Sequence, residues 1–177
     1  PVDRTEWGMT PPTVNAYYNP AFNEIVFPAG ILQYPFFDMK TDDAAIYGAI
    51  GAVIGHEMTH GFDDQGCEYA ADGNLKNWWT EEDKSRFEEK TKMVKEQYDG
   101  YTILDGKHVN GALTLGENIA DLGGITIAYD AFKKTTQGKG NTKIDGFTPD
   151  QRFFMSWAQV WRQNIRNEEA EQRLVTD

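Results

Sequence analysis

The segment 53–60 (VIGHEMTH) constrains this chain more than any other, because its pattern makes chemical sense only on a helix. Residues four apart on an α-helix lie about 40° apart around the axis and about 6 Å apart along it. His56 and His60 therefore point the same way and can hold one zinc ion through their imidazole nitrogens. Glu57 lies about 100° around the helix, where its carboxylate can act on a water at the metal without binding the metal. The spacing predicts the central helix of a zinc hydrolase.

A helix that carries two histidines and no metal is the alternative, and the motif alone leaves it open. A catalytic zinc also needs a third protein ligand and an open position. The longer pattern HExxHxxGxxH would place glycine at position 63 and histidine at position 66, where the chain has Asp63 and Gly66. The remaining histidine, His108, lies in a Gly-Lys-His-Val-Asn-Gly setting that favours an exposed loop. We therefore expect the third ligand to be a carboxylate.

The segment 116–121 (GENIAD) contains the best candidate for that carboxylate. Glu117 and Asp121 are four apart, so both project from one face of a helix. If Glu117 binds zinc, Asp121 can accept the free N–H of a zinc-binding histidine, which fixes the tautomer of the ring. The alternative is a capping box, in which Glu117 bonds only the backbone N–H of Thr114. Capping alone does not account for Asp121, so a ligand role is favoured.

Composition limits the classes of protein that this chain can belong to. At 177 residues and 40% hydrophobic content, residues 1–177 are expected to form a single domain. A net charge of −11 argues against a nucleic-acid partner, because phosphate binding requires a basic surface. Cys67 is the single cysteine and cannot form an internal disulfide. The longest apolar stretch, 44–55, is too short to cross a bilayer, and no direct membrane insertion is expected.

The local patterns predict a helix-dominated α+β domain with a small β-hairpin near its start. The hairpin strands are expected at 14–18 and 24–27, joined through Asn19-Pro20 by a loop of five or six residues. A buried central helix is expected at about 44–61, with glycines 48, 51 and 55 placed for close packing. Further helices are expected at 81–98, at 114–134 and, after a glycine-bearing loop, from a Thr148-Pro149 start. The last helix should present one apolar face, made of Phe153, Phe154, Trp157, Val160, Trp161 and Ile165.

Four segments, taken in order, resemble the neprilysin and endothelin-converting-enzyme family of zinc metallopeptidases. They are 14–18 (VNAYY), 25–32 (IVFPAGIL), 53–64 (VIGHEMTHGFDD) and 116–124 (GENIADLGG). The resemblance implies a thermolysin-like zincin catalytic domain that binds one zinc ion. It implies zinc ligands at His56, His60 and Glu117, with Glu57 as the general base and Asp121 orienting His56.

The resemblance also implies where a peptide would lie. Asn15, Ala16 and Tyr17 match a motif that follows an edge strand in the family and holds the substrate backbone. An apolar pocket for the side chain just after the cleaved bond is implied at Ile31, Phe36, Val53 and Trp161. From the residues alone, these two groups would be an ordinary hairpin edge and ordinary core positions. Asp63 is expected to support the metal site, and Asp177 resembles an acid that orients a histidine.

The function implied is a zinc-dependent metalloendopeptidase that hydrolyses oligopeptides and prefers an apolar residue after the cleaved bond. In the family, an N-terminal helical domain encloses the cavity, and members are commonly membrane-anchored or exported. An extracytoplasmic location is therefore expected, with a cytoplasmic one left as the alternative. In the family, a histidine that stabilises the oxyanion of the reaction follows a Thr-Asp pair, and an arginine lies further on. In this chain both would follow Asp177, so we expect the 177 residues to cleave peptides poorly. Two alternatives stay open: a non-catalytic zinc-binding scaffold, and a metallo-aminopeptidase, for which no acidic anchor of a substrate N-terminus is identified.

Overall fold

The structure is a computed structural model in which residues 3 and 5–176 are described. It is dominated by helices, as expected, and it has two small antiparallel strand pairs where the sequence predicted one. The strands are β1 (Tyr17–Asn19) with β2 (Glu24–Val26), and β3 (Thr102–Ile103) with β4 (Lys107–His108). The longer helices are α2 (Ala52–Thr59), α3 (Glu81–Asp99), α4 (Leu115–Phe132), α6 (Pro149–Val160) and α7 (Asn167–Thr176). The shorter ones are η1 (Ala29–Ile31), α1 (Asp43–Ile46), η2 (Tyr47–Gly51), η3 (His60–Phe62), η4 (Gly66–Glu68) and α5 (Thr136–Lys139).

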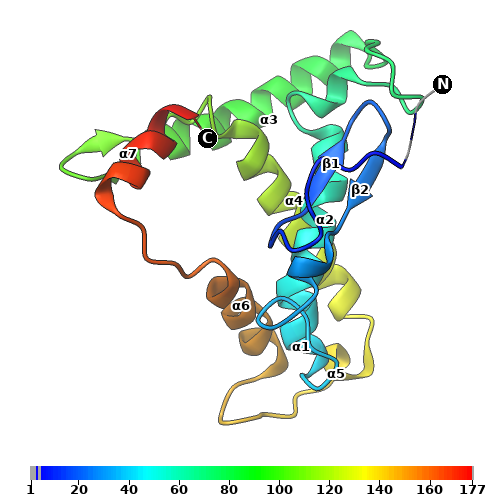
Figure 1. Cartoon of the computed structure of the whole chain (residues 1–177), viewed down its shortest axis with the longest axis vertical. Helices are drawn as coiled ribbons and strands as arrows, with labels where there is room; N and C mark the ends of the chain where they lie inside the picture. Colours follow the sequence, from blue (N-terminus) through cyan, green and yellow to red (C-terminus); the bar gives the residue numbers. More distant parts are fainter. Residues whose placement is uncertain (1–2, 4, 177) are drawn as a thin grey trace.

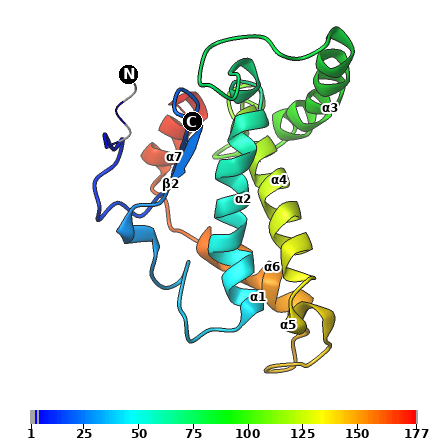
Figure 2. The ribbon, with the colours of Figure 1, turned by 90° about the vertical axis from the view of Figure 1, so that its right-hand side faces the viewer.

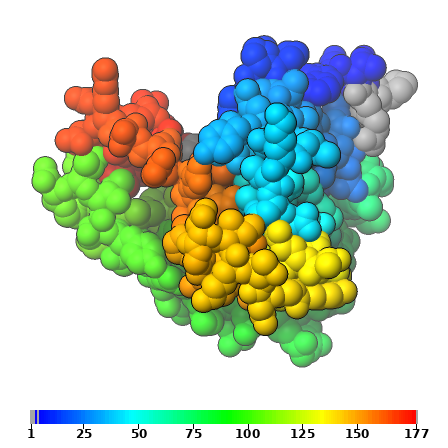
Figure 3. All heavy atoms as spheres, turned by 90° about the horizontal axis from the view of Figure 1, so that it is seen from below, coloured from blue at the N-terminus to red at the C-terminus, as the bar shows by residue number. Residues whose placement is uncertain are grey.

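The helices α2 and α4 lie side by side at the centre of the molecule (Figure 1, Figure 2). The β1–β2 hairpin lies along α2, and α6 packs beside α1 and η2. The helix α3 contacts α4 and extends away from its N-terminal end. Seen from below, α7 and the β3–β4 pair stand to one side of the body that α1, α5 and α6 form (Figure 3). The arrangement leaves one flank of the α2–α4 pair facing the hairpin and the other flank facing outward.

The predicted central helix runs without a break through α1, η2, α2 and η3, from Asp43 to Phe62. The Asp42 side chain caps its start by accepting a hydrogen bond of 3.0 Å from the backbone N–H of Ala45. Its middle turn, Tyr47–Gly51, is a π-helix, which the sequence did not predict. The prediction of a buried central helix is confirmed for most positions between Ala44 and Glu57.

The glycines of this helix differ in what surrounds them. A Cβ at Gly48 would lie 2.1 Å from the carbonyl oxygen of Phe153, so the backbone of α6 approaches it directly. A Cβ at Gly55 would lie 2.7 Å from the carbonyl oxygen of Gly124 in α4. The expectation of close packing is confirmed at both of these positions. It is wrong for Gly51, where a Cβ would come no closer than 3.5 Å, to its own helix.

The hairpin forms with a shorter first strand than expected. Tyr17 pairs with Val26, and Asn19 pairs with Glu24, so the connecting loop is 20–23 rather than five or six residues. Asn23 closes this loop at a φ of 46°, a left-handed conformation that asparagine tolerates. The strand begins three residues later than the predicted 14–18, so Asn15 and Ala16 lie just before β1.

The later helices begin where the sequence predicts but do not all end there. Thr80 caps α3, and Thr148 starts α6 with a complete capping box. The predicted apolar face of the last helix is only partly correct, because α6 ends at Val160. Phe153 is fully buried, whereas Phe154, Trp161 and Ile165 are each at least 40% exposed. The sequence did not predict α5, α7 or the β3–β4 pair, and His108 lies on exposed β4 rather than in a loop.

Two buried clusters hold the central helix in place. One contains Ala44, Ala52, Ala128, Phe132 and Phe153, with the last two rings stacked at 5.6 Å between centroids. The other contains Ala16, Ile31, Ile50 and Val53 and joins the hairpin region to the helix. No helix in the described part of the chain is long and apolar enough to cross a membrane.

The three glycines supply a matched test of the packing. Gly48→Ala and Gly55→Ala should each lower the free energy of unfolding by about 1–3 kcal/mol, because the new methyl group meets backbone atoms. Gly51→Ala should raise it by up to about 1 kcal/mol, because alanine is the better helix former and the new methyl group would make only ordinary van der Waals contacts. Urea unfolding curves measure all three, and equal effects at positions 51 and 55 would contradict the packing described.

Candidate metal centre and substrate cleft

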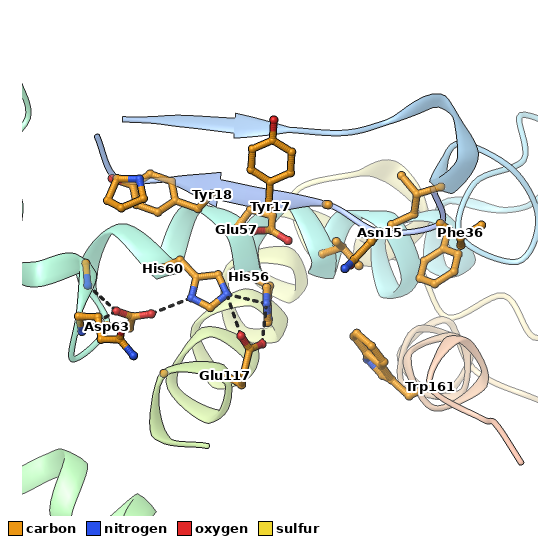
Figure 4. Close-up of a pocket in the computed structure, with 18 of the residues that line it drawn as sticks. Asn15, Tyr17, Tyr18, Phe36, His56, Glu57, His60, Asp63, Glu117 and Trp161 are labelled. Atoms are coloured by element: carbon orange, nitrogen blue, oxygen red, sulfur yellow. Dashed lines mark hydrogen bonds and ion pairs between the residues drawn. The ribbon is translucent and has the colours of Figure 1, made fainter. Parts of the chain in front are cut away.

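The two histidines of α2 and its continuation point at each other across one turn. The Nε2 atoms of His56 and His60 lie 2.9 Å apart. The Glu117 carboxylate faces both, with one oxygen 3.3 Å from Nε2 of His56 and the other 3.6 Å from Nε2 of His60 (Figure 4). The helices α2 and α4 thus bring two imidazole nitrogens and a carboxylate to one point.

Each imidazole is also held from behind by a second carboxylate. An Asp121 oxygen lies 2.8 Å from Nδ1 of His56, and an Asp63 oxygen lies 2.7 Å from Nδ1 of His60. These bonds fix each ring with its Nε2 turned toward Glu117. The sequence suggested a partner for one histidine in Asp121, and a supporting role for Asp63 without saying which atom it contacts.

The loop after the second histidine positions Asp63 through its backbone. The other Asp63 oxygen accepts hydrogen bonds from the backbone N–H groups of Gln65, at 2.9 Å, and Gly66, at 2.6 Å. A Cβ at Gly66 would lie 1.8 Å from the carbonyl oxygen of His60, so only glycine lets the loop fold back this closely. The local turn therefore places the buried Asp63 carboxylate behind the His60 ring.

The capping-box alternative for Glu117 is wrong. The backbone of Thr114 has a φ of −89° and a ψ of 10°, and its side chain makes no capping bond. Its hydroxyl instead accepts a hydrogen bond of 2.9 Å from the side-chain amide of Asn118. The Glu117 carboxylate is left to face the histidines.

Glu57 lies beside this group and is 4% exposed. Burial raises the pKa of its carboxyl group, against the opposing effects of the charges on His56 and His60 and of a backbone hydrogen bond at Tyr18. His56, Glu57 and His60 could also offer ligand atoms within 4.8 Å of one another. We favour Glu117 over Glu57 as the third ligand because its two oxygens directly face the two Nε2 atoms.

The carboxylates set the charge of the histidines in the metal-free chain. Burial alone would lower the pKa of His56, but hydrogen bonds to Asp121 and Glu117 and the charges of both raise it to about 10. The pKa of His60 is raised as well: its burial is outweighed by Asp63 and Glu117. His56 in turn holds the pKa of Glu117 below its ordinary value. This cluster of acids therefore strongly favours a cation.

A cleft of about 560 Å³ runs past this cluster. Its lining includes every candidate site residue from the sequence except Asp121, which stands behind His56, and Asp177, which lies outside the described residues. Phe36, Asn15 and Trp161 lie at one end, and Tyr18 and Asp63 at the other (Figure 4). Ile31 and Val53 belong to a buried core cluster and also line the cleft. For these two residues, the interpretation as core positions and the interpretation as pocket lining are therefore compatible.

Other cleft residues were missed by the sequence analysis. They include Tyr18, Gln65, Tyr69, Leu113 and Gly116, all of which line the cleft. Tyr18 adjoins the recognised segment 15–17, which was a usable signal. Gln65 and Tyr69 carry no such signal, because only the return of the loop after Asp63 brings them to the cleft.

A helical His-Glu-x-x-His pair faced by a carboxylate from a second helix defines a candidate metallohydrolase centre. The sequence model of peptidase family M13 matches residues 15–177. The chain therefore belongs to peptidase family M13.

Individual relatives agree with this assignment. The chain is 51% identical over its whole length to an endothelin-converting enzyme homolog of Locusta migratoria, and 48% identical over 99% of its length to human endothelin-converting enzyme 1. It covers 25% and 23% of those proteins, so it spans about a quarter of their length. The crystal structure of the zinc metalloprotease Zmp1 of Mycobacterium tuberculosis in complex with inhibitor superposes on all of the chain with a TM-score of 0.95 at 56% identity, and the chain covers 28% of it.

The charge of His56 predicts how stability depends on pH. Its folded-state pKa of about 10 lies above the ordinary value of 6.5, so the stability it contributes is fully present below pH 6.5 and is lost as the pH rises through about 10. We expect the free energy of unfolding of the metal-free chain to fall across that window, and Asp121→Asn to remove much of the fall. Urea unfolding with a chelator present measures this, with Asp130→Asn, an exposed acid on the same helix, as the control. An unchanged pH profile for Asp121→Asn would contradict the account.

Proposed function

We propose that this chain is the zinc-binding part of the catalytic domain of a metalloendopeptidase. The observation that carries the proposal is the convergence of Nε2 of His56, Nε2 of His60 and the Glu117 carboxylate, with the buried Glu57 beside them. Membership in peptidase family M13 and similarity to a zinc metalloprotease support it. A purely structural zinc site would have no use for a buried Glu57 with a raised pKa.

The donor set fits zinc. Two imidazole nitrogens and one carboxylate are the protein ligands of many catalytic zinc sites, which keep a further position open. Asp121 and Asp63 would hold the two rings in the tautomer that presents Nε2 to the metal. In the metal-free chain the same point favours protons, and zinc binding would release them.

The proposed reaction is hydrolysis of a peptide bond. When bound, zinc would lower the pKa of a water toward about 7 and polarise the carbonyl group of the substrate. Glu57 would accept the proton of the attacking water and pass it to the leaving amine. Burial shifts the pKa of Glu57 upward, which is the direction that favours both steps, because a group that takes and returns a proton works best when its pKa is near the working pH.

The substrate would lie as an added strand beside β1, in a thermolysin-like arrangement. A hairpin edge can pair with an extended peptide through main-chain hydrogen bonds, and the exposed Asn15 side chain offers both a donor and an acceptor. Phe36 and Trp161 would grip an apolar side chain just after the cleaved bond, above a floor of Ile31 and Val53. Ala16 and Tyr17 would contribute backbone contacts, and Asp177 would orient a histidine supplied by a longer chain.

The whole protein would be longer than this segment. We propose that an N-terminal helical domain encloses the cleft and restricts it to oligopeptides, at an extracytoplasmic location. The coverage of about a quarter of each relative supports the first part of this proposal. The tests below therefore use a chain of the relatives' length that contains these residues.

Glu57→Gln tests the catalytic role. We expect turnover of a fluorogenic peptide with an apolar residue after the cleaved bond to fall at least about 10²-fold, because the proton carrier is lost. Zinc content, measured by elemental analysis, should stay at the wild-type level, whereas Glu117→Gln should lose zinc. Zinc binding without any Glu57-dependent turnover would favour the non-catalytic scaffold instead.

Asp121→Asn and Asp63→Asn test the positioning of the two histidines. Each should weaken zinc binding by about 10–100-fold, because an amide holds the imidazole less firmly in the ligating tautomer. Competition with a chromophoric chelator measures the affinity. Asp64→Asn serves as the control, since this neighbouring carboxylate makes no hydrogen bond to either histidine within the described residues. A loss of affinity equal in Asp63→Asn and Asp64→Asn would show a general charge effect instead.

A further inference from the structure

The turn η2, which leads into α2, is a π-helix and makes a backbone donor available outside the helix. In an α-helix each N–H bonds the carbonyl four residues earlier, whereas in a π-helix the partner lies five residues earlier, so the change of step releases one N–H. Within η2, the N–H of Ile50 donates to the carbonyl oxygen of Phe36 at 3.1 Å. Ile50 is 5% exposed, so this bond is made in the interior. The turn is thereby tied to a loop that lies earlier in the chain.

That loop carries one wall of the proposed apolar pocket. The N–H of Phe36 donates to the carbonyl oxygen of Gln33 at 2.9 Å, which folds the loop into a tight turn. The side chain of Gln33 in turn donates to the carbonyl oxygen of Gly30 at 2.6 Å. The Phe36 side chain packs against the buried cluster that contains Ile50. Because the loop is compact, its bond to Ile50 fixes where the Phe36 ring lies in the cleft.

The other wall, Trp161, depends on the same turn through α6. Gly48 belongs to η2, and the carbonyl group of Phe153 in α6 occupies the place where a side chain at position 48 would be. Just before η2, the carbonyl oxygen of Ala45 accepts a hydrogen bond of 2.8 Å from the hydroxyl of Ser156. Trp161 directly follows the last residue of α6. A shift of α6 against η2 would therefore carry Trp161 with it.

The two walls lie on opposite sides of one end of the cleft (Figure 4). They are also joined directly, because the side-chain amide of Gln159 in α6 donates to the hydroxyl of Tyr34 in the loop at 2.8 Å. The loop and α6 are far apart in the sequence, and η2 is the element that contacts both. Their spacing is therefore set where they meet this turn.

We propose that η2 sets the distance between Phe36 and Trp161, and with it the size of the apolar side chain that the cleft accepts. An ordinary α-helical turn would offer the loop no N–H, and a residue larger than glycine at position 48 would not admit α6 so closely. Gly48 and Ile50 are thus positioning residues for the two walls. The inference rests on the proposed function, because it takes the cleft as the site where a peptide binds.

Gly48→Ala tests the proposal by moving one wall and not the other. The added methyl group meets backbone atoms of Phe153, so α6 must shift while the loop stays bonded to Ile50. The substitution is made in a chain of the relatives' length that carries Glu57→Gln, so that peptides bind without being cleaved. Fluorescence anisotropy measures the Kd of two labelled peptides that differ only in leucine or alanine at the position of the proposed pocket.

The ratio of the two Kd values reports how well the walls fit the side chain. In the Glu57→Gln parent it should be about tenfold or more in favour of leucine, because a fitted apolar pocket gains at least this much from a few carbon atoms. We expect Gly48→Ala to lower the ratio at least about threefold, since displaced walls lose those contacts.

Two further variants accompany the test. Gly111→Ala is the matched control, because a Cβ there would lie 2.3 Å from the carbonyl oxygen of Lys95 in α3, which carries neither wall. It should destabilise the fold in the same way and leave the ratio unchanged. Ser156→Ala adds no clash and only releases α6 from the carbonyl of Ala45, so it should lower the ratio by about twofold. This variant decides the question if Gly48→Ala does not fold.

Three outcomes would overturn the proposal. One is a ratio that stays at the parent value in folded Gly48→Ala, or in Ser156→Ala where Gly48→Ala does not fold. Another is an equal fall in Gly111→Ala, which would show a general loosening of the fold. The third is a parent that does not favour leucine, which would show that the cleft has no such pocket. None of these readouts needs turnover, so a protein that binds with the expected ratios but never cleaves peptides would refute the proposed catalysis and leave this inference standing.

Discussion

The close crossing of α2 and α4 is the constraint on which the rest of the structure depends. A Cβ at Gly55 would strike the carbonyl oxygen of Gly124, and a Cβ at Gly124 would strike the backbone nitrogen of His56. Because neither glycine has a side chain, the two backbones are in contact at Gly55, which directly precedes His56. Glu117 lies two turns before Gly124 and Asp121 lies one turn before it, so both carboxylates meet the histidines. A wider crossing would separate the two halves of the metal centre.

The candidate metal centre is an electrostatic arrangement as much as a geometric one. Glu117, Asp121 and Asp63 surround two imidazoles and raise the pKa of both. Such a concentration of acid groups would be costly without a positive charge at its centre. In the metal-free chain protons provide that charge, and the proposed zinc ion would provide it in the enzyme. The same carboxylates that would orient the ligands thus stabilise the fold while the metal is absent.

Much of the fold could be predicted because its signals are local. Thr80 and Thr148 mark helix starts, since a cap needs only the residues of the first turn. Helix ends were harder: α6 stops at Val160 although Trp161 and Ile165 continue its apolar pattern. The short strands β3 and β4 and the helix α7 escaped prediction, because a contact between distant segments, such as the 2.6 Å ion pair of Lys107 with Glu171, has no local sequence pattern.

The sequence by itself determined the chemistry. It contains two histidines at helical spacing, a glutamate between them and a second acid pair one turn apart, and local helix geometry is enough to interpret these spacings. Only the tertiary structure decided which atoms meet. It placed the Glu117 carboxylate, already favoured as a ligand, against both histidines and excluded the capping alternative. It also assigned Asp63 to His60 and brought Gln65 and Tyr69 to the cleft. The physical reason is that these contacts join segments that are separate in the sequence. The crossing of α2 and α4 and the return of the loop after Asp63 bring them together, and no single stretch of sequence encodes either.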